Sequence, residues 1–128
     1  MNLLLDTHVA LWALAGGASR IGPATLAVLS DRRNVVAVSP VSVWEIEIKR
    51  AIGKLDAPDG FARECVDRGF DELPITFDHA QAAGQLPLHH TDPFDRMLIG
   101  QATVEDYRIV TADRAFAAYG VALLDPAG

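Results

Sequence analysis

Short apolar runs alternate along the chain with segments in which apolar residues recur at helical spacing. Residues 3–5, 35–38 and 121–124 are continuous apolar runs bounded by polar or turn residues, a pattern typical of strands covered on both faces, and residues 108–111, with Ile109 and Val110 at their centre, predict another buried strand. The segment 73–75 predicts a further short strand, and its proline restricts it to a sheet edge or a strand start. Each of these runs but the last is followed by residues of helical periodicity.

The predicted helices cover residues 9–14, 23–29, 41–52, 58–69, 78–83, 95–102 and 113–119. In the helix at 41–52, the apolar stripe consists of Val41, Trp44, Ile48 and Ile52, and Glu45 lies off it. In the segment after Pro58, the apolar face consists of Phe61, Cys65 and Val66. Asp78 is the predicted cap of its helix, Asp113 caps the last one, and either Asp92 or Asp95 opens the longest late helix.

Strands that alternate with helices imply right-handed crossovers and a sheet with helices on both faces. The sequence therefore predicts an α/β protein, a three-layer α/β/α fold with a mostly parallel central sheet. At 128 residues, without a repeat or a linker, the chain forms a single domain over residues 1–128.

The net charge, the length of the apolar runs and the cysteine content limit the classes of function that the protein can have. The net charge of −6 argues against a protein that holds nucleic acid through the phosphate backbone alone, unless divalent cations offset the excess carboxylates. No apolar run approaches the roughly 18 residues of a membrane-spanning helix, and no basic segment opens the chain. The single cysteine, Cys65, forms no internal disulfide and has no companion at zinc-ligand spacing, which fits a cytoplasmic protein.

Four acids are placed where a parallel sheet binds its ligands, outside the carboxyl ends of the strands. Asp6 and Asp113 each follow a predicted strand, so both emerge at one edge of the sheet. Glu45 and Asp95 each lie about one turn into a helix, from which a carboxylate reaches the same edge. Crowded carboxylates raise one another's pKa unless a cation compensates them. Oxygen ligands favour Mg²⁺ or Mn²⁺, and such ions suit phosphodiester chemistry.

Each of these residues also has a purely structural interpretation. Asp6 and Asp113 can be helix caps. Glu45 can face solvent in an i,i+4 pair with Lys49, worth a few tenths of a kcal/mol. Of Asp92 and Asp95, one can cap the helix while the other acts, and Asp95 is the preferred metal ligand. The remaining ligand candidates are read as ordinary polar contacts without an assigned role: His8, His79, His89 and His90.

Four segments, in order, resemble the PIN-domain family and, more narrowly, the VapC-type toxins of bacterial VapBC toxin–antitoxin pairs. They are LLLDTHVALWAL, SPVSVWEIEIK, HHTDPFDRMLIGQA and IVTADRAFAAYGV, and together they span nearly the whole chain. The resemblance places metal-binding and catalytic roles on Asp6, Glu45, Asp95 and Asp113, with Asp92 close by. Thr111-Ala112-Asp113 lacks the asparagine that many relatives have between threonine and acid. Gly100 replaces a frequent alanine, at a helix-propensity cost of about 1 kcal/mol.

The resemblance implies a Mg²⁺- or Mn²⁺-dependent endoribonuclease that cuts single-stranded regions of transfer, ribosomal or messenger RNA and so inhibits translation. It also implies a homodimer and a cognate VapB-type antitoxin whose C-terminal segment occupies the acidic groove, where the carboxylates could accommodate an arginine. From charge alone, the candidate RNA contacts are Arg32, Arg33, Lys49, Arg50, Arg96 and Arg114.

Other functions fit less well or remain open. A haloacid-dehalogenase-like phosphatase needs a second acid two residues after Asp6, where His8 stands, and a receiver domain needs a late lysine, whereas the last lysine is Lys54. A PIN-fold protein that processes RNA, or that binds RNA or a partner without cutting, remains an alternative.

Overall fold

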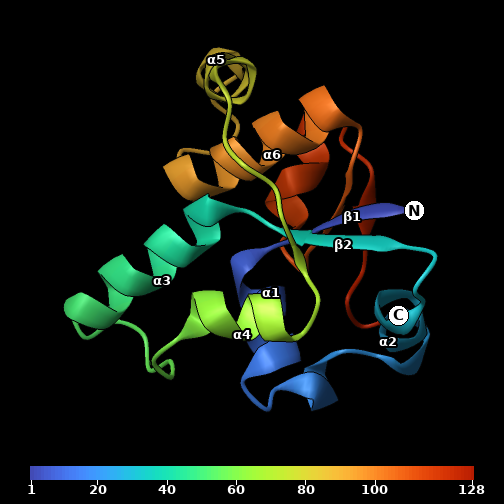
Figure 1. Ribbon diagram of the computed structural model, residues 1–128. Coiled ribbons are helices and arrows are strands. Elements are labelled where there is room, and N and C mark those ends of the chain that lie inside the picture. Colours follow the sequence, from blue (N-terminus) through green and yellow to red (C-terminus); the bar gives the residue numbers. More distant parts are fainter.

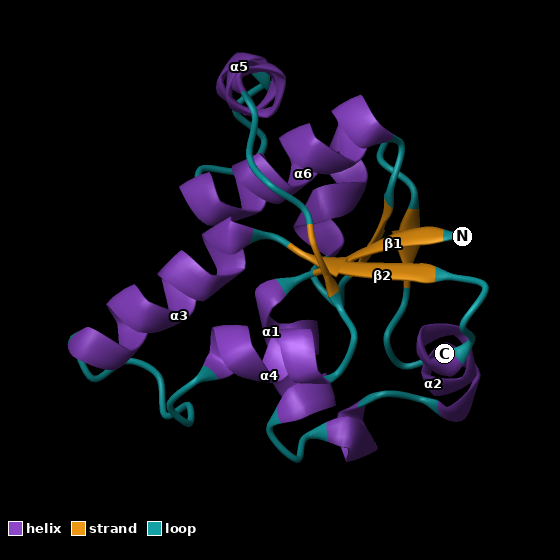
Figure 2. Cartoon of the chain, viewed as in Figure 1, coloured by secondary structure: helices purple, strands orange, loops and turns teal.

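The five strands form one sheet in which every neighbouring pair is parallel (Figure 2). The computed structural model describes residues 1–128, apart from the side chain of Ala18. The strands are β1 (Asn2–Leu5), β2 (Val35–Val38), β3 (Asp71–Glu72), β4 (Arg108–Val110) and β5 (Leu123–Leu124), in the order β3-β2-β1-β4-β5. The sheet is thus wholly rather than mostly parallel, and β1 lies at its centre.

Helices cover both faces of the sheet, as Figure 1 shows. They are α1 (Thr7–Leu14), α2 (Pro23–Ser30), α3 (Pro40–Ala51), α4 (Phe61–Asp67), α5 (Phe77–Gln85) and α6 (Pro93–Glu105), with 3₁₀ turns η1 (Ala18–Arg20) and η2 (Arg114–Tyr119). In Figure 1, α1 and α4 lie below the sheet, α5 and α6 lie above it, and α3 projects from the carboxyl ends of the strands. The predicted three-layer fold is confirmed.

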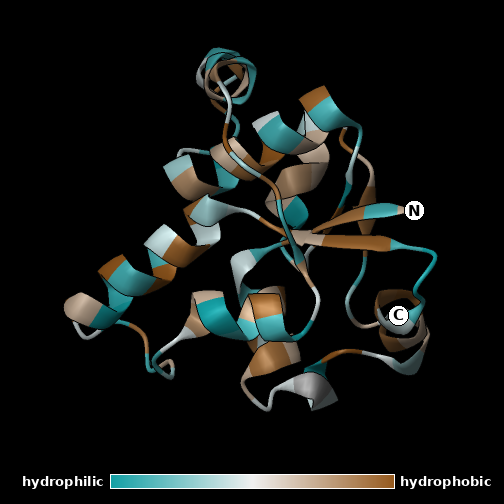
Figure 3. Cartoon of the chain, in the orientation of Figure 1, coloured by the Kyte–Doolittle hydropathy of each residue, from teal (hydrophilic) through white to brown (hydrophobic). Residues whose placement is uncertain are grey.

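The two layers of core follow from the alternation of side chains along each strand. Leu3 and Leu5 of β1 belong to a cluster with Val9 of α1 and Phe61 of α4. Leu4, between them, belongs to the opposite cluster with the α6 residues Leu98 and Ile99, the η2 residue Phe116 and others. In Figure 3 the strands at the centre are brown, the colour of hydrophobic residues. Burial on both faces explains why these strands are continuously apolar.

Helix α3 buries a different face from the predicted one. Trp44 and Ile52, placed on the core stripe by their spacing, are 61% and 59% exposed. Val41 of that stripe is buried as predicted, but the other buried residues of the helix, Ser42, Glu45 and Ile46, lie off the predicted stripe. The helix therefore turns two polar residues inward, where a site at the end of the sheet supplies them with hydrogen-bond partners. Trp44 packs at the surface, edge-on against Phe94 of α6, with ring centroids 5.4 Å apart.

Other element predictions need smaller corrections. The edge strand β3 consists of the polar residues Asp71 and Glu72, which directly precede the predicted apolar segment 73–75. Within that segment, the N–H of Leu73 donates to the carbonyl of Val38 and so continues the pairing by one residue. Paired on one side alone, an edge strand needs little apolar surface. Val66 of α4 is exposed, and the last strand covers two residues rather than four.

Helix α5 begins with a cap other than the predicted Asp78. Thr76 is the N-cap: its hydroxyl accepts the N–H of His79, and Nδ1 of His79 accepts the N–H of Thr76. This reciprocal pair satisfies two of the free donors at the helix start.

Helix α5 packs closely on α6 at Gly100. A Cβ at position 100 would lie 2.8 Å from the backbone nitrogen of Ala83 and 2.9 Å from the carbonyl oxygen of His79. The close approach of the two helices therefore requires a glycine at position 100. Helix propensity, which favours alanine there, gives no sign of this contact. Among the described residues, no helix is long and apolar enough to cross a membrane.

Candidate active site

The pairing of β1 with β4 brings Asp6 and Asp113 to one edge of the sheet, as predicted. The N–H of Asp6 extends the ladder to the carbonyl of Val110 at 3.0 Å. This register sets Asp6 beside Thr111, whose hydroxyl donates to Oδ2 of Asp6 at 2.8 Å. The same hydroxyl oxygen accepts the N–H of Asp113 at 3.0 Å. Thr111 thus links the two acids that follow the central strands.

Asp6 and Glu45, called here the inner group, are buried and held by hydroxyl groups. Only 7% of Asp6 and 3% of Glu45 is exposed. The hydroxyl of Thr7, adjacent to Asp6, donates to Oε1 of Glu45 at 2.7 Å, and its oxygen lies 2.9 Å from the hydroxyl oxygen of Ser42. Nζ of Lys49 lies 2.5 Å from Oε2 of Glu45. The pair expected at the surface therefore exists, but its carboxylate faces the site.

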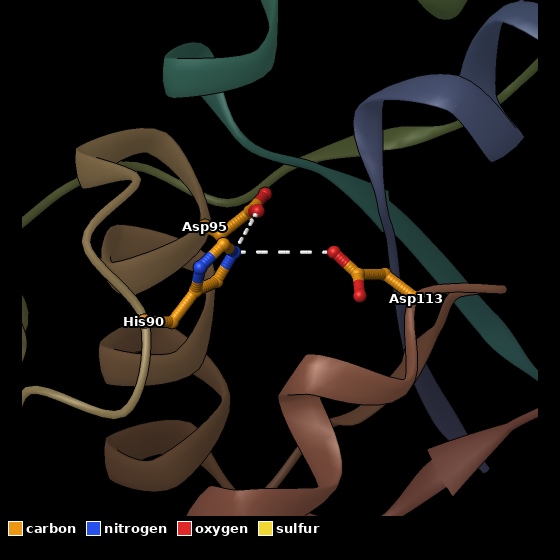
Figure 4. Close-up of side chains that lie close together, drawn as sticks. All are labelled: His90, Asp95 and Asp113. Carbon is orange, nitrogen blue, oxygen red and sulfur yellow. Dashed lines mark hydrogen bonds and ion pairs between the residues drawn. The ribbon is translucent and has the colours of Figure 1, made fainter.

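His90, Asp95 and Asp113, called here the outer group, approach one another from three elements (Figure 4). Nε2 of His90 lies 2.7 Å from Oδ2 of Asp95 and 3.9 Å from Oδ2 of Asp113. Figure 4 shows the imidazole, from the loop before α6, between the two carboxylates. One ligand atom from each residue lies within 4.8 Å of the other two. His90 was not assigned a role from the sequence.

Asp92 and Asp95 have different roles at the start of α6. Oδ1 of Asp92 accepts the N–H groups of Phe94 at 2.9 Å and Asp95 at 3.3 Å, so Asp92 is the N-cap of α6. Asp95 lies in the first turn with its carboxylate directed at His90. Asp113 has both roles, since its Oδ1 caps η2 through the N–H of Ala115 while Oδ2 faces His90.

The pKa values show that the acids affect one another. Burial raises the pKa of Asp6; the Thr111 hydroxyl opposes this, and the charge of Glu45 adds to it. Burial raises the pKa of Asp95 to about 7 against the opposing hydrogen bond from His90, and the charges of Asp92 and Asp6 add to the rise. Asp6 is thus within electrostatic reach of both Glu45 and Asp95. Together with the Thr111 link to Asp113, these effects connect all four predicted acids at one site.

The loop that carries His90 is fixed by two side chains. The N–H of His90 donates to the phenol oxygen of Tyr119 at 2.7 Å, and that hydroxyl donates to the carbonyl of Pro87 at 2.9 Å. Arg96 of α6 donates to the carbonyls of His90 and Pro87 at 3.2 and 3.0 Å. It also donates to carbonyls at the end of α5, on Ala83, Gly84 and Leu86. This loop is therefore pinned between α6 and η2.

Four of the six basic residues predicted to contact RNA are either engaged by other groups or lie away from the acids. Arg96 is a structural residue, because its guanidinium is occupied by backbone carbonyls rather than free for RNA. Arg32 and Arg33 precede β2 and so lie at the amino edge of the sheet, opposite the acids, and Arg33 pairs with Asp31. Arg50 pairs with Glu47 and Asp59.

Two of the predicted basic contacts remain beside the acids. The hydrogen bond that Lys49 donates to Glu45 raises the pKa of Lys49, and the charges of Glu45, Asp92 and Asp95 add to the rise. Arg114 follows Asp113 directly. Arg114 and Asp113 line a pocket of about 360 Å³ together with Thr111, Ala112, Ala117, Leu123 and Asp125.

Sequence reasoning missed the residues that orient the carboxylates. Thr7 directly follows Asp6, and Thr111 follows the end of β4 two residues before Asp113, so hydroxyl groups close to strand-end acids were the available signal. His90 stands five residues before Asp95, a spacing that carries no periodic signal, and its position depends on the loop held by Arg96 and Tyr119.

Fold and site together define a three-layer α/β protein with an acidic site at the carboxyl edge of a parallel sheet. The family model of the PIN domain matches residues 3–122, and the chain belongs to this family. Over 61 residues it is 38% identical to Ribonuclease VapC16 of Mycobacterium tuberculosis. That match covers 46% of this chain and only 43% of the relative's length.

Solved structures share the fold over nearly the full length. VapBC2 from Rickettsia felis, crystallised with a DNA fragment from its promoter, matches with a TM-score of 0.71 and 15% identity, over 97% of this chain and 98% of that one. DNA-bound VapBC from Salmonella typhimurium matches with a TM-score of 0.68 and 16% identity, over 98% of each chain. VapBC-1 from nontypeable Haemophilus influenzae matches with a TM-score of 0.67 and 15% identity, also over 98% of each. At these identities the likeness establishes the fold.

Proposed function

We propose that this protein is a metal-dependent endoribonuclease that acts as the toxin of a type II toxin–antitoxin pair. The observation that carries the proposal is the convergence of Asp6, Glu45, Asp95 and Asp113 on the carboxyl edge of the sheet, where burial and mutual repulsion raise the pKa of two of them. Membership of the PIN-domain family and the partial likeness to a ribonuclease support it.

The donor set fits Mg²⁺ or Mn²⁺. Carboxylate oxygens are hard ligands, and a divalent cation would offset the burial and repulsion that disfavour the charged forms of Asp6 and Asp95. Asp6 and Asp95 would hold the ion, Glu45 would help to ligate it or orient the attacking water, and Asp113 would complete the set. A bound ion would lower the pKa of a water molecule and stabilise charge on the phosphodiester oxygens.

The surrounding side chains give these carboxylates fixed directions before any ligand arrives. Thr111 fixes one oxygen of Asp6, while Thr7 and Lys49 engage the two oxygens of Glu45. Fixed acceptors lose little conformational freedom when a cation binds, which favours tight and specific coordination. The inner group is therefore suited to anchoring the site, and the outer group, whose Asp113 is exposed, would be the part that RNA reaches.

The proposal extends to substrate, partners and location. The substrate is a single-stranded region of transfer, ribosomal or messenger RNA, and cleavage inhibits translation in the cytoplasm. The partner is a VapB-type antitoxin whose arginine enters the acidic site, and the protein forms a homodimer or a hetero-oligomer with that antitoxin. The net charge of −6 and the likeness to chains solved as VapBC complexes support a basic partner segment.

The test is cleavage of total cellular RNA by the purified protein, with Mg²⁺ or Mn²⁺ and with EDTA. Asp6→Asn keeps the size of the side chain but removes its charge, and Asp67→Asn is the matched control, because Asp67 is exposed on α4 and pairs only with Arg63. Discrete fragments are expected from the wild type and Asp67→Asn. EDTA abolishes them, and Asp6→Asn lowers the rate at least about 100-fold, since even residues that merely orient metal ligands contribute 10–100-fold.

Two results would contradict the proposal in different ways. Cleavage by Asp6→Asn at the wild-type rate would remove Asp6 from the active site. No cleavage under any condition would favour a PIN-fold module that binds RNA or a partner without cutting. Growth arrest on expression, relieved by a small reading frame directly upstream, separates a toxin from an RNA-processing nuclease.

A further inference from the structure

The imidazole of His90 occupies a position between two proposed metal ligands. Its Nε2 lies 2.7 Å from a carboxylate oxygen of Asp95 and 3.9 Å from one of Asp113. Neighbouring ligands of an octahedral ion at 2.0–2.1 Å are about 3 Å apart, and opposite ligands about 4 Å. The three donor atoms, all within 4.8 Å of one another, therefore span little more than a coordination sphere.

The backbone of His90 is fixed independently of the carboxylates. Its N–H donates to the phenol oxygen of Tyr119, and its carbonyl accepts from Arg96 at 3.2 Å and lies 3.3 Å from the same phenol oxygen. The ring also lies against Phe116, with centroids 6.3 Å apart. Contacts from α6 and η2 thus hold the imidazole so that Nε2 points toward the carboxylates of Asp95 and Asp113, as Figure 4 shows. Such prior positioning is what a ligand side chain requires.

His89, its neighbour in sequence, has different surroundings. Its exposed ring stacks edge-on against Tyr119, with centroids 5.3 Å apart. Among the residues whose side chains the structure describes, the group of three potential ligands found at this site includes His90 and not His89. Two adjacent histidines thus provide a matched pair, one beside the carboxylates and the other exposed and packed against Tyr119.

We propose that His90 is a direct ligand of the cation, together with Asp95 and Asp113, and that its nitrogen makes the site prefer a transition-metal ion such as Mn²⁺ to Mg²⁺. The proposal rests on the metal site of the proposed function and deepens it. Mg²⁺ prefers oxygen ligands and gives up water reluctantly, whereas imidazole nitrogen suits first-row transition metals. A nitrogen donor among carboxylates therefore shifts selectivity without changing the acidic framework.

The test uses the full chain loaded with Mn²⁺ and read by electron paramagnetic resonance. Loss of the free Mn²⁺ signal measures binding, and pulsed spectra detect ¹⁴N coupled to the bound ion. The wild type and His89→Ala are expected to show the nitrogen coupling, and His90→Ala to lose it. Mn²⁺ affinity of His90→Ala should fall about 10-fold or more, as expected for a lost contact to the metal, while Mg²⁺ affinity, measured by competition, falls less.

The outcomes separate this proposal from the one on which it rests. If the wild type binds no Mn²⁺, both the ligand assignment and the metal-dependent nuclease are overturned. If Mn²⁺ binds without nitrogen coupling, or with coupling that persists in His90→Ala, His90 is not a ligand while the carboxylate site stands. Circular dichroism verifies the fold of each variant, and His90→Gln, which keeps the backbone hydrogen bonds and a polar side chain, repeats the test should His90→Ala unfold.

Discussion

The inner and outer groups of the acidic site are held by different means. Asp6 and Glu45 are buried beside the central strand and receive hydroxyl hydrogen bonds from Thr7 and Thr111. The outer carboxylates stand on the first turn of α6 and the start of η2, and a histidine from a loop lies between them. The sheet positions one half of the site, and helix packing positions the other. Damage to helix packing should therefore reach the outer group first.

Among the changes that leave the carboxylates in place, removing the Thr7 hydroxyl should give the largest effect. Thr7→Val keeps the shape of the side chain but leaves Oε1 of Glu45 without its 2.7 Å donor. We expect RNA cleavage to fall about 10–100-fold, as for other residues that orient metal-site groups. Thr103→Val is the control, because that hydroxyl bonds only to the carbonyl of Ile99 within α6. Equal rates for the two variants would show that the inner group does not depend on its hydroxyl support.

Asp95 of the outer group should make a large contribution to the pH dependence of stability. Folding raises the pKa of Asp95 from 3.8 to about 7, so the folded state favours the protonated carboxyl. This contribution to stability is fully present below about pH 4 and is lost as the pH rises through about 7. Each unit of pKa shift corresponds to about 1.4 kcal/mol, so a decrease of a few kcal/mol is expected in the metal-free protein.

Chemical denaturation between pH 4 and 8, with EDTA present, measures this decrease. Asp95→Asn does not ionise and should flatten the profile, whereas an unchanged profile would assign the pH dependence to other groups. Divalent cation should restore stability mainly at the upper end of the range, where the carboxylates are charged and bind it without releasing protons.

The smallest expected effect concerns the packing of α5 on α6 behind the outer group. Gly100→Ala gains about 1 kcal/mol of helix propensity, but its Cβ would meet the backbone of α5 at 2.8 Å. Overpacking of this kind costs about 1–3 kcal/mol, so net destabilisation is expected. Gly84→Ala, also in a helix but with nothing within 4 Å of the added Cβ, should be neutral or stabilising. Thermal melts of the two variants measure the change in stability. A higher melting temperature for Gly100→Ala would show that α5 can move away from α6 without a loss of stability.

The same division explains how far the sequence could predict the site. Strand-end positions identified Asp6 and Asp113, because a parallel sheet collects its carboxyl ends at one edge. The inward face of α3 was predicted correctly at Val41 but wrongly at Trp44 and Ile52, since apolar periodicity cannot foresee that Glu45 is buried against Thr7. His90 was missed because its place depends on tertiary contacts from Arg96 and Tyr119. The ends of the strands could be recognised in the sequence, whereas the side-chain contacts between elements could not.

The pairing of β1 with β4 also determines when the site can assemble during synthesis. Asp6 and Thr111 are 105 residues apart in the chain, yet the hydroxyl of Thr111 donates a hydrogen bond to the carboxylate of Asp6 at the ends of adjacent strands. While a nascent chain emerges from the ribosome, its first strand waits for a partner that is translated much later, and non-local pairing of this kind is slow. A protein proposed to attack the RNA of translation would therefore remain without a complete site at least until Thr111 has left the ribosome that makes it.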